Sequence, residues 1–214
     1  MTMDFEQFKN NWKQFCRNRD ACKEGFADIL SSLSPSDIIN LASKYMYDVY
    51  GERYHDIVCR EAQEWYDSFR DEWQAAHIYI NDPHEDGMNW ITDASREWQI
   101  HGTSRTYVFC AAHVDAYDKT EMFSRSDGAL AILHDYTTGR IDGGGVEARD
   151  RCLLYCKTDG AKCYDASTSY IEAGSIRDYG HLKITAYDNT TVYSDTTKKI
   201  FLYGNAQLKP LNEA

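Results

Sequence analysis

The 214-residue sequence lacks most features that identify membrane, secreted or nucleotide-binding proteins. No stretch approaches the roughly 18 consecutive apolar residues that a membrane helix needs. The opening residues, MTMDFEQFKN, contain acids and no apolar core, so we expect no secretory signal. The motifs GxGxxG, GxxxxGK[ST] and GxSxG are also absent. The usual signatures of dinucleotide, triphosphate and α/β-hydrolase sites are therefore missing.

Paired cysteine motifs are missing too. The seven cysteines are odd in number and scattered, and none forms a CxxC pair. Since disulfides belong to oxidising compartments, this pattern favours reduced thiols and a cytoplasmic protein. The alternative is a secreted protein with a disulfide between Cys16 and Cys22.

A basic stripe is the third missing feature. The net charge is −11, and residues 1–105 contain 11 Lys and Arg against 19 Asp and Glu. Residues 106–214 contain 12 against 15. This balance argues against direct binding of nucleic acid or of an anionic membrane, and it permits a protein partner with a basic surface.

What the sequence does contain is a short repeat. Residues 112–175 divide into eight consecutive units of eight residues: AHVDAYDK, TEMFSRSD, GALAILHD, YTTGRIDG, GGVEARDR, CLLYCKTD, GAKCYDAS and TSYIEAGS. After the interruption IRDYGH, the register resumes as LKITAYDN, TTVYSDTT and KKIFLYGN. A fixed short period of this kind is typical of a solenoid.

Each octad reads as one short strand and one corner. The third and fifth positions, such as Val114 with Ala116, lie two residues apart and should face the core together. The seventh and eighth positions hold turn residues, as in Asp118-Lys119. The pattern weakens at Arg140, Lys162 and Glu172, where we expect a one-residue slip that exchanges the strand faces.

The number of octads per coil stays open at this point. Two octads would give a flattened solenoid of roughly 16 residues per turn, and three would give a triangular one of roughly 24. The open ends of a solenoid need covering. We expect helices of the N-terminal half to cover the first coil and Lys209-Pro210 to close the last.

The N-terminal half has helical periodicity. Apolar spacing and start signals predict helices over 4–17, 20–32, 35 to about 50 and 52–77. A loop should follow over 80–87, then a short helix or turn near 92–98, and residues 106–110 should form the first strand. The sequence thus predicts an α+β protein with a helical, acidic, aromatic-rich domain at 1–105. A single-stranded β-solenoid (a β-helix) of eight-residue repeats should occupy 106–214.

The segment 61–98 is the candidate interaction site, with ten acids, two bases and four of the five tryptophans. Aromatic residues are enriched in interface hot spots, and clustered carboxylates suit a basic groove. The simpler alternative is that the tryptophans form the helical core and the acids a solvated face. The candidate partner-contacting residues are Glu61, Glu64, Asp67, Asp71, Glu72, Trp73, Asp82, Glu85, Asp86 and Trp90.

The sequence gives only weak evidence for a set of catalytic residues. Two octads per coil would stack Asp118, His134 and Asp150 in one column, whereas three would stack Asp118 with Asp142. Either set resembles an acid/base pair, but Asp at a corner also has a backbone role. No histidine or cysteine spacing matches a metal site. We expect no catalytic residues, no metal and no cofactor.

The octads AHVDAYDK, GGVEARDR, LKITAYDN and TTVYSDTT carry a resemblance. They are similar to the xxVxAxDN arrays of short-repeat β-solenoid proteins, often with a small helical N-terminal domain, from gut bacteria, their phages and mobile elements. The resemblance covers about residues 106–208 and implies a fold. It carries over no catalytic residue.

Three function classes follow. The leading hypothesis is a non-enzymatic protein-interaction module, in its sharper form an acidic inhibitor of a nucleic-acid-handling host-defence protein. The alternatives are a polysaccharide-active β-helix enzyme and a self-assembling structural protein. Because helices block one end of the solenoid, we expect a monomer or dimer rather than a filament.

Overall fold

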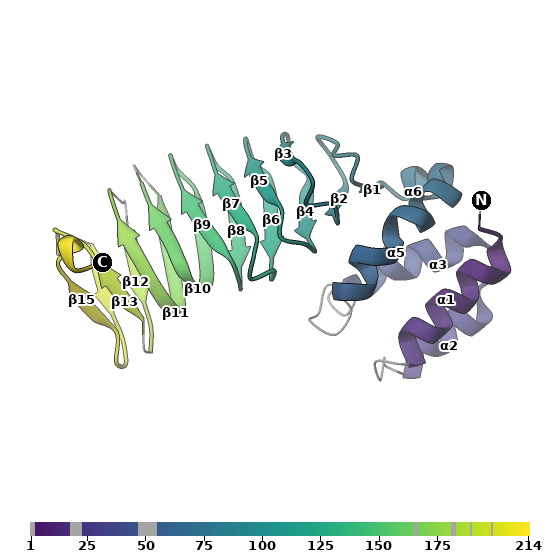
Figure 1. Cartoon of the computed structure of the whole chain (residues 1–214), viewed down its shortest axis with the longest axis horizontal. Helices are drawn as coiled ribbons and strands as arrows, with labels where there is room; N and C mark the ends of the chain where they lie inside the picture. Colours follow the sequence, from purple (N-terminus) through teal and green to yellow (C-terminus); the bar gives the residue numbers. More distant parts are fainter. Residues whose placement is uncertain are drawn as a thin grey trace.

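The computed structural model describes residues 3–17, 23–46, 55–164, 167–180, 183–188, 190–197 and 199–214. Within these ranges, helices at the N-terminal end precede a parallel β-solenoid of about seven turns (Figure 1). The α+β class and the β-helix are therefore as predicted. The strands lie side by side along one long axis, and the helices stand at one end of it (Figure 1).

The helices are α1 (Phe5–Arg17), α2 (Lys23–Ser31), α3 (Pro35–Lys44), α5 (His55–Ser68) and α6 (Arg70–Ala75). The start of α3 is a capping box, as the sequence predicts: the Asp37 N–H donates to Ser34 Oγ, and the Ser34 N–H donates to an Asp37 oxygen. The single helix expected over 52–77 is wrong, because the backbone at Phe69 leaves the helical region and separates α5 from α6. The predicted helical stretches at 20–22 and 47–54 lie outside the described residues, as does Cys22.

Fifteen strands are assigned in the described ranges, and a 3-10 turn, η1 (Leu211–Glu213), follows them. The strands are β1 (Ile78–Ile80), β2 (Met88–Ile91), β3 (Glu97–Ile100), β4 (Arg105–Val108), β5 (His113–Ala116), β6 (Glu121–Ser124), β7 (Leu130–Leu133), β8 (Thr138–Ile141), β9 (Gly145–Ala148), β10 (Leu153–Cys163), β11 (Thr168–Asp178), β12 (Lys183–Ala186), β13 (Thr191–Tyr193), β14 (Ile200–Leu202) and β15 (Gln207–Lys209).

The strand array begins earlier than expected. The strand predicted at 106–110 is β4, and β1, β2 and β3 precede it. The helix or turn expected near 92–98 is also wrong at its C-terminal side, where Glu97 and Trp98 belong to β3. The missed strands are only three or four residues long, and Asn89 and Gln99 interrupt the apolar runs of β2 and β3. The proposed division at residue 105 stays a prediction, but strand pairing already starts at Ile78.

Two octads make one turn. Glu97 in β3 pairs with His113 in β5, and Arg105 in β4 pairs with Glu121 in β6, sixteen residues further on in both cases. The even strands β2 to β8 stack into one sheet, and the odd strands β3 to β9 stack into the other. β10 passes through both sheets, since Leu153 pairs with β8 and Gly160 pairs with β9. The solenoid is therefore the flattened, two-sided form.

The octad register is not continuous, however. Glu121 pairs with Thr138, seventeen residues on, and Thr138 pairs with Leu153, only fifteen on. The corner 125–129 gains a residue and the corner 142–144 loses one, so the strands between them are shifted. The octads predict that Leu130 and Ile132 face the core. This prediction is wrong, because the shift turns the opposite face of the strand inward.

The shifted strands bury the neighbours of the expected residues. The inward side chains are Ala131 and Leu133 in β7 and Ile141 in β8. The predicted slip is confirmed at Arg140, which is exposed, and at Lys162, whose neighbours Ala161 and Cys163 are buried. The side chain of Glu172 lies outside the described set. Because a one-residue slip exchanges both faces, Ala131 fills the core where the octads predicted Leu130, and Leu133 fills it where they predicted Ile132.

The helices and the first coil share one core. Trp73 of α6 and Trp90 of β2 are both fully buried, with ring centroids 5.6 Å apart. Trp90 also contacts Phe109, whose carbonyl accepts a hydrogen bond from the Cys59 thiol of α5 at 2.5 Å. The N-terminal helices therefore cover the first coil, as expected.

The other end of the solenoid is not closed. β14 pairs with β12 and β15 pairs with β13, and neither has a second neighbour among the described strands. The segment after Lys209 forms η1, where the Leu211 N–H donates to Asp195 Oδ1. Phe201 and Leu202 stay 45% and 39% exposed. The expectation that Lys209-Pro210 closes the last coil is therefore wrong.

Candidate functional site

The acids of 61–86 lie on α5, α6 and the loop after β1, and hydrogen bonds join these three elements. The loop after β1 packs against α5, because Asn81 Nδ2 donates to Gln63 Oε1 at 2.7 Å. The Tyr66 hydroxyl donates to Asp82 Oδ2 at 3.2 Å, and Gln74 of α6 donates to the same hydroxyl. These contacts join α5, α6 and the loop into what we call the acidic surface: Glu61, Glu64, Asp67, Asp71, Glu72, Asp82, Glu85 and Asp86.

Most of this charge has no counter-ion. Arg60 pairs with Glu61 and Arg70 pairs with Asp67, each at 3.0 Å and partly exposed to solvent. Glu64, Asp71 and the remaining acids of the surface form no ion pair within the described ranges. A fixed set of unneutralised carboxylates creates a negative potential that a cationic partner can relieve.

Two tyrosines beside these acids have raised pKa values, first because of burial and then because of the neighbouring carboxylates. Burial raises the pKa of Tyr66, and the adjacent Asp82 carboxylate raises it further against an opposing hydrogen bond from Gln74. Burial likewise raises the pKa of Tyr79, with Asp86 and Asp82 acting in the same direction. A phenolate is disfavoured because it would place another negative charge beside the carboxylates.

The candidate tryptophans occupy the core instead. Trp73 and Trp90 are fully buried between the helices and the first coil. Trp65 and Trp98 are buried as well. This placement corrects the expectation that Trp73 and Trp90 contact a partner, and it matches the alternative that the tryptophans form the helical core. The partner-binding role of the acids stays a prediction.

The corner aspartates are structural. Asp118, Asp135 and Asp150 all have positive φ angles and occupy equivalent positions in successive turns. The Asp118 N–H donates to Asp135 Oδ2, and the Asp135 N–H donates to Asp150 Oδ2. The Gly102 N–H similarly donates to Asp118. Each carboxylate therefore joins its turn to the preceding one, which explains why Asp is used in this left-handed corner.

The candidate catalytic residues converge only in part: His134 Nδ1 lies 3.7 Å from Asp150 Oδ2. His134 lies one position before the aspartate column, in a stack of rings in which Tyr117 lies between His101 and His134 at 4.7 and 4.5 Å. Asp142 lies at the opposite edge of the solenoid and pairs with Arg125 at 3.3 Å. His134 and Asp150 are therefore neighbours, as the two-octad alternative predicted, whereas Asp142 lies apart from them and the four residues do not form one site.

The corner has a sequence signature that the octad division obscures. An aromatic residue, His or Arg is followed by Asp, any residue, and a small polar residue, as in YDKT, HDYT, RDRC and YDAS. The fourth residue closes the corner: Thr120 Oγ1 donates to the Tyr117 carbonyl at 2.9 Å. The recurrence of this tetrad, rather than of the octad, tracks the true coil length.

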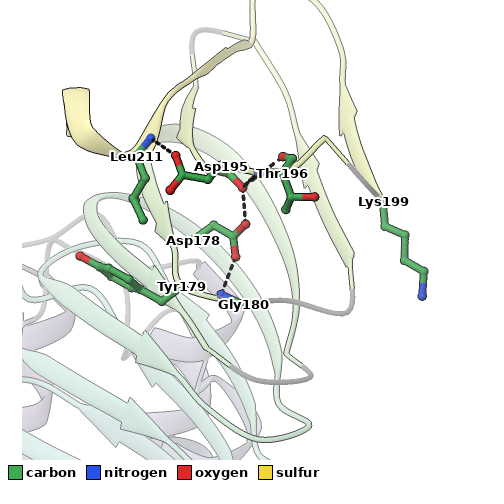
Figure 2. A pocket seen from close by; sticks show the side chains of 8 residues that line it. Asp178, Tyr179, Gly180, Asp195, Thr196, Lys199 and Leu211 are labelled. Atoms are coloured by element: carbon green, nitrogen blue, oxygen red, sulfur yellow. Dashed lines mark hydrogen bonds between the residues drawn. The ribbon is translucent and has the colours of Figure 1, made fainter.

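A pocket of about 610 Å³ lies at the irregular corner near the C-terminal end (Figure 2). Asp178 is almost fully buried in it and accepts hydrogen bonds from the Gly180 N–H at 2.9 Å and the Ser194 hydroxyl at 2.5 Å. Ser194 also accepts from the Thr196 N–H. Asp178 thus fixes two neighbouring corners by hydrogen bonds, which is a structural role.

The described residues give no support for a metal site or for a reactive cysteine thiol. No group of three or more His, Cys, Asp or Glu side chains there can hold a metal. Burial raises the pKa of Cys152 and of Cys163 to about 12 and that of Cys110 to about 11, so these thiols stay protonated at neutral pH. Gly143 and Gly144 lie in a corner, as expected from the sequence, whereas Gly145 begins β9.

Comparisons of the chain with protein-family models, with curated proteins and with solved structures find no match. No helix in the described residues is long and apolar enough to cross a membrane.

Proposed function

We propose that this protein is a non-enzymatic, cytoplasmic interaction module that binds a protein partner through its acidic surface. The observation that carries the proposal is that α5, α6 and the adjoining loop are joined by hydrogen bonds and carry eight carboxylates, of which only Glu61 and Asp67 form ion pairs within the described residues. Their support is rigid, because the same helices pack on the fully buried Trp73 and Trp90. A rigid charged surface loses little entropy on binding.

The partner that suits this surface is a protein with a basic, nucleic-acid-binding channel. Carboxylates spaced along a surface can occupy positions that phosphates would otherwise take, and they steer association electrostatically. The resemblance of the octads to those of bacterial, phage and mobile-element proteins supports a host-defence protein as that partner. In this role the chain inhibits by occupying the channel, and it needs no catalytic residue or cofactor.

Two matched variants test the proposal. The first replaces four acids of the surface, as Glu64→Gln, Asp71→Asn, Glu85→Gln and Asp86→Asn. The control replaces four exposed acids elsewhere, as Glu6→Gln, Glu24→Gln, Asp127→Asn and Glu213→Gln. Both variants change the net charge equally, so a difference between them reports position and not total charge.

The measurement is affinity capture from a bacterial host lysate at low and high salt, followed by titration of the captured protein with and without competing DNA. We expect wild type and control to capture the same basic protein stoichiometrically, with loss at high salt and displacement by DNA. The surface variant should bind at least about tenfold more weakly. Equal binding by both variants, or no basic partner at all, would reject the proposal.

A further inference from the structure

The last strands at the C-terminal end of the solenoid are edge strands. Among the described strands, β14 and β15 each have one neighbour, so their outer N–H and C=O groups form an edge that can accept another strand. The side chains that extend the solenoid core into these last strands are only partly buried. Leu202, which pairs with the buried Ala186, is 39% exposed, and Ile200 and Leu208 are only partly buried.

The charge at this end differs from that of the rest of the chain. Residues 183–214 contain four Lys and three Asp and Glu, for a net charge of +1, whereas the whole chain carries −11. The remainder is therefore strongly acidic and repels a second copy of itself, while this end does not. The exposed side chains at the edge are mostly apolar or aromatic, including Phe201 and Tyr203 at 45% and 52%.

We propose that two copies of this chain associate tail to tail, with β14 of one copy pairing antiparallel with β14 of the other around Phe201. A two-fold axis makes the same edge meet itself in an antiparallel pair, which closes the assembly at two copies. The helices at the opposite end of each copy then prevent further growth.

The register of β14 is self-complementary in this arrangement. With Phe201 opposite its own copy, Ile200 lies opposite Leu202, so inward apolar side chains meet apolar side chains. Lys199 lies opposite Tyr203, which pairs a cation with an aromatic ring. The Phe201 ring already lies 5.4 Å from the Lys183 ammonium within its own copy. No two like charges face each other across this strand pair.

Sedimentation of the full chain over a wide concentration range tests the association. We expect a species of twice the chain mass for wild type. Phe201→Glu should shift the dissociation constant upward by at least about 100-fold, because it sets like charges opposite each other at the axis. The control is Tyr155→Glu, since Tyr155 is a comparably exposed ring in the same outward column but on the interior strand β10.

A second variant tests the register without relying on a charge. Phe201→Cys places two thiols opposite each other, within the Cα separation that a disulfide spans, so oxidation should give a covalent dimer. Tyr155→Cys should give none, and wild type controls for the native cysteines. A single-chain mass at every concentration, a dimer unaffected by Phe201→Glu, or open-ended polymers would overturn the proposal. The acidic surface plays no part in these readouts, so they stand or fall independently of the proposed function.

Discussion

At the residue scale, the corner aspartates show how one side chain serves both backbone and packing. Asp118, Asp135 and Asp150 occupy a left-handed conformation that few non-glycine residues adopt readily, and each accepts a hydrogen bond from the preceding turn. The sequence predicts their turn role correctly. It does not predict that Asp135, rather than His134, continues the column, because the extra residue at 125–129 is invisible in the octad count.

Substitution of Asp135 separates the structural role from a chemical one. Asp135→Ala loses the acceptor for the Asp118 N–H and strains the left-handed backbone, so we expect the free energy of unfolding to fall by about 2 kcal/mol. Asp135→Asn keeps an acceptor oxygen and tolerates the conformation, and it should cost less than about 1 kcal/mol. Denaturant unfolding measures both. Equal losses for Ala and Asn would show that the carboxylate charge itself is needed.

At the element scale, the corners and not the strands control the register. The octad pattern predicts strand composition well, since Val114 with Ala116 and Val146 with Ala148 face the core as expected. It fails for β7 because Leu130 and Ile132 are as apolar as the residues that are actually buried. When both faces of a strand are apolar, hydrophobicity alone cannot choose between them, and the lengths of the flanking corners decide.

The corner 142–144 returns the chain to register, and its tightest position is Gly144. Gly144 has a φ of +78°, and a Cβ there would lie 2.3 Å from the Ala129 carbonyl oxygen. Gly144→Ala should therefore lower the free energy of unfolding by more than about 2 kcal/mol. Its neighbour provides the control: a Cβ at Gly145 meets only the end of the Leu130 side chain, at 3.3 Å.

We expect Gly145→Ala to change the free energy of unfolding by less than about 1 kcal/mol. The comparison uses denaturant unfolding followed by far-ultraviolet circular dichroism for both variants. If the two alanine variants unfolded at the same denaturant concentration, the conformation assigned to this corner would be incorrect.

At the scale of the whole molecule, the helices and the solenoid share a core. The sequence predicts both halves and the capping role of the helices, but it places the first strand at 106 and assigns two core tryptophans to a surface. Aromatic residues beside acids give the same sequence pattern whether their side chains contact a partner or another element of the same chain. Only the packing of α6 on β2 distinguishes the two, with Trp73 against Trp90 at 5.6 Å.

The shared core predicts coupled unfolding. Trp90→Ala removes a fully buried ring between α6 and Phe109, and it should cost about 3–5 kcal/mol. Because helices and first coil lose the same contact, helical signal and tryptophan fluorescence should shift together to lower denaturant. Tyr136→Ala, at an exposed corner residue, serves as the control and should shift neither by much. Separate transitions for the two signals would argue against one cooperative core.

The regular two-octad turn also means that the length of the molecule increases by a fixed step with each turn. Each turn adds one strand spacing, about 4.8 Å, along the solenoid axis. The number of turns therefore sets the distance between the acidic helical end and the open strand edge at the other end (Figure 1). Since each turn contacts only its neighbours, whole turns can be gained or lost without disturbing either end. Evolution can thus adjust the reach of this protein in steps of one turn while both end surfaces stay unchanged.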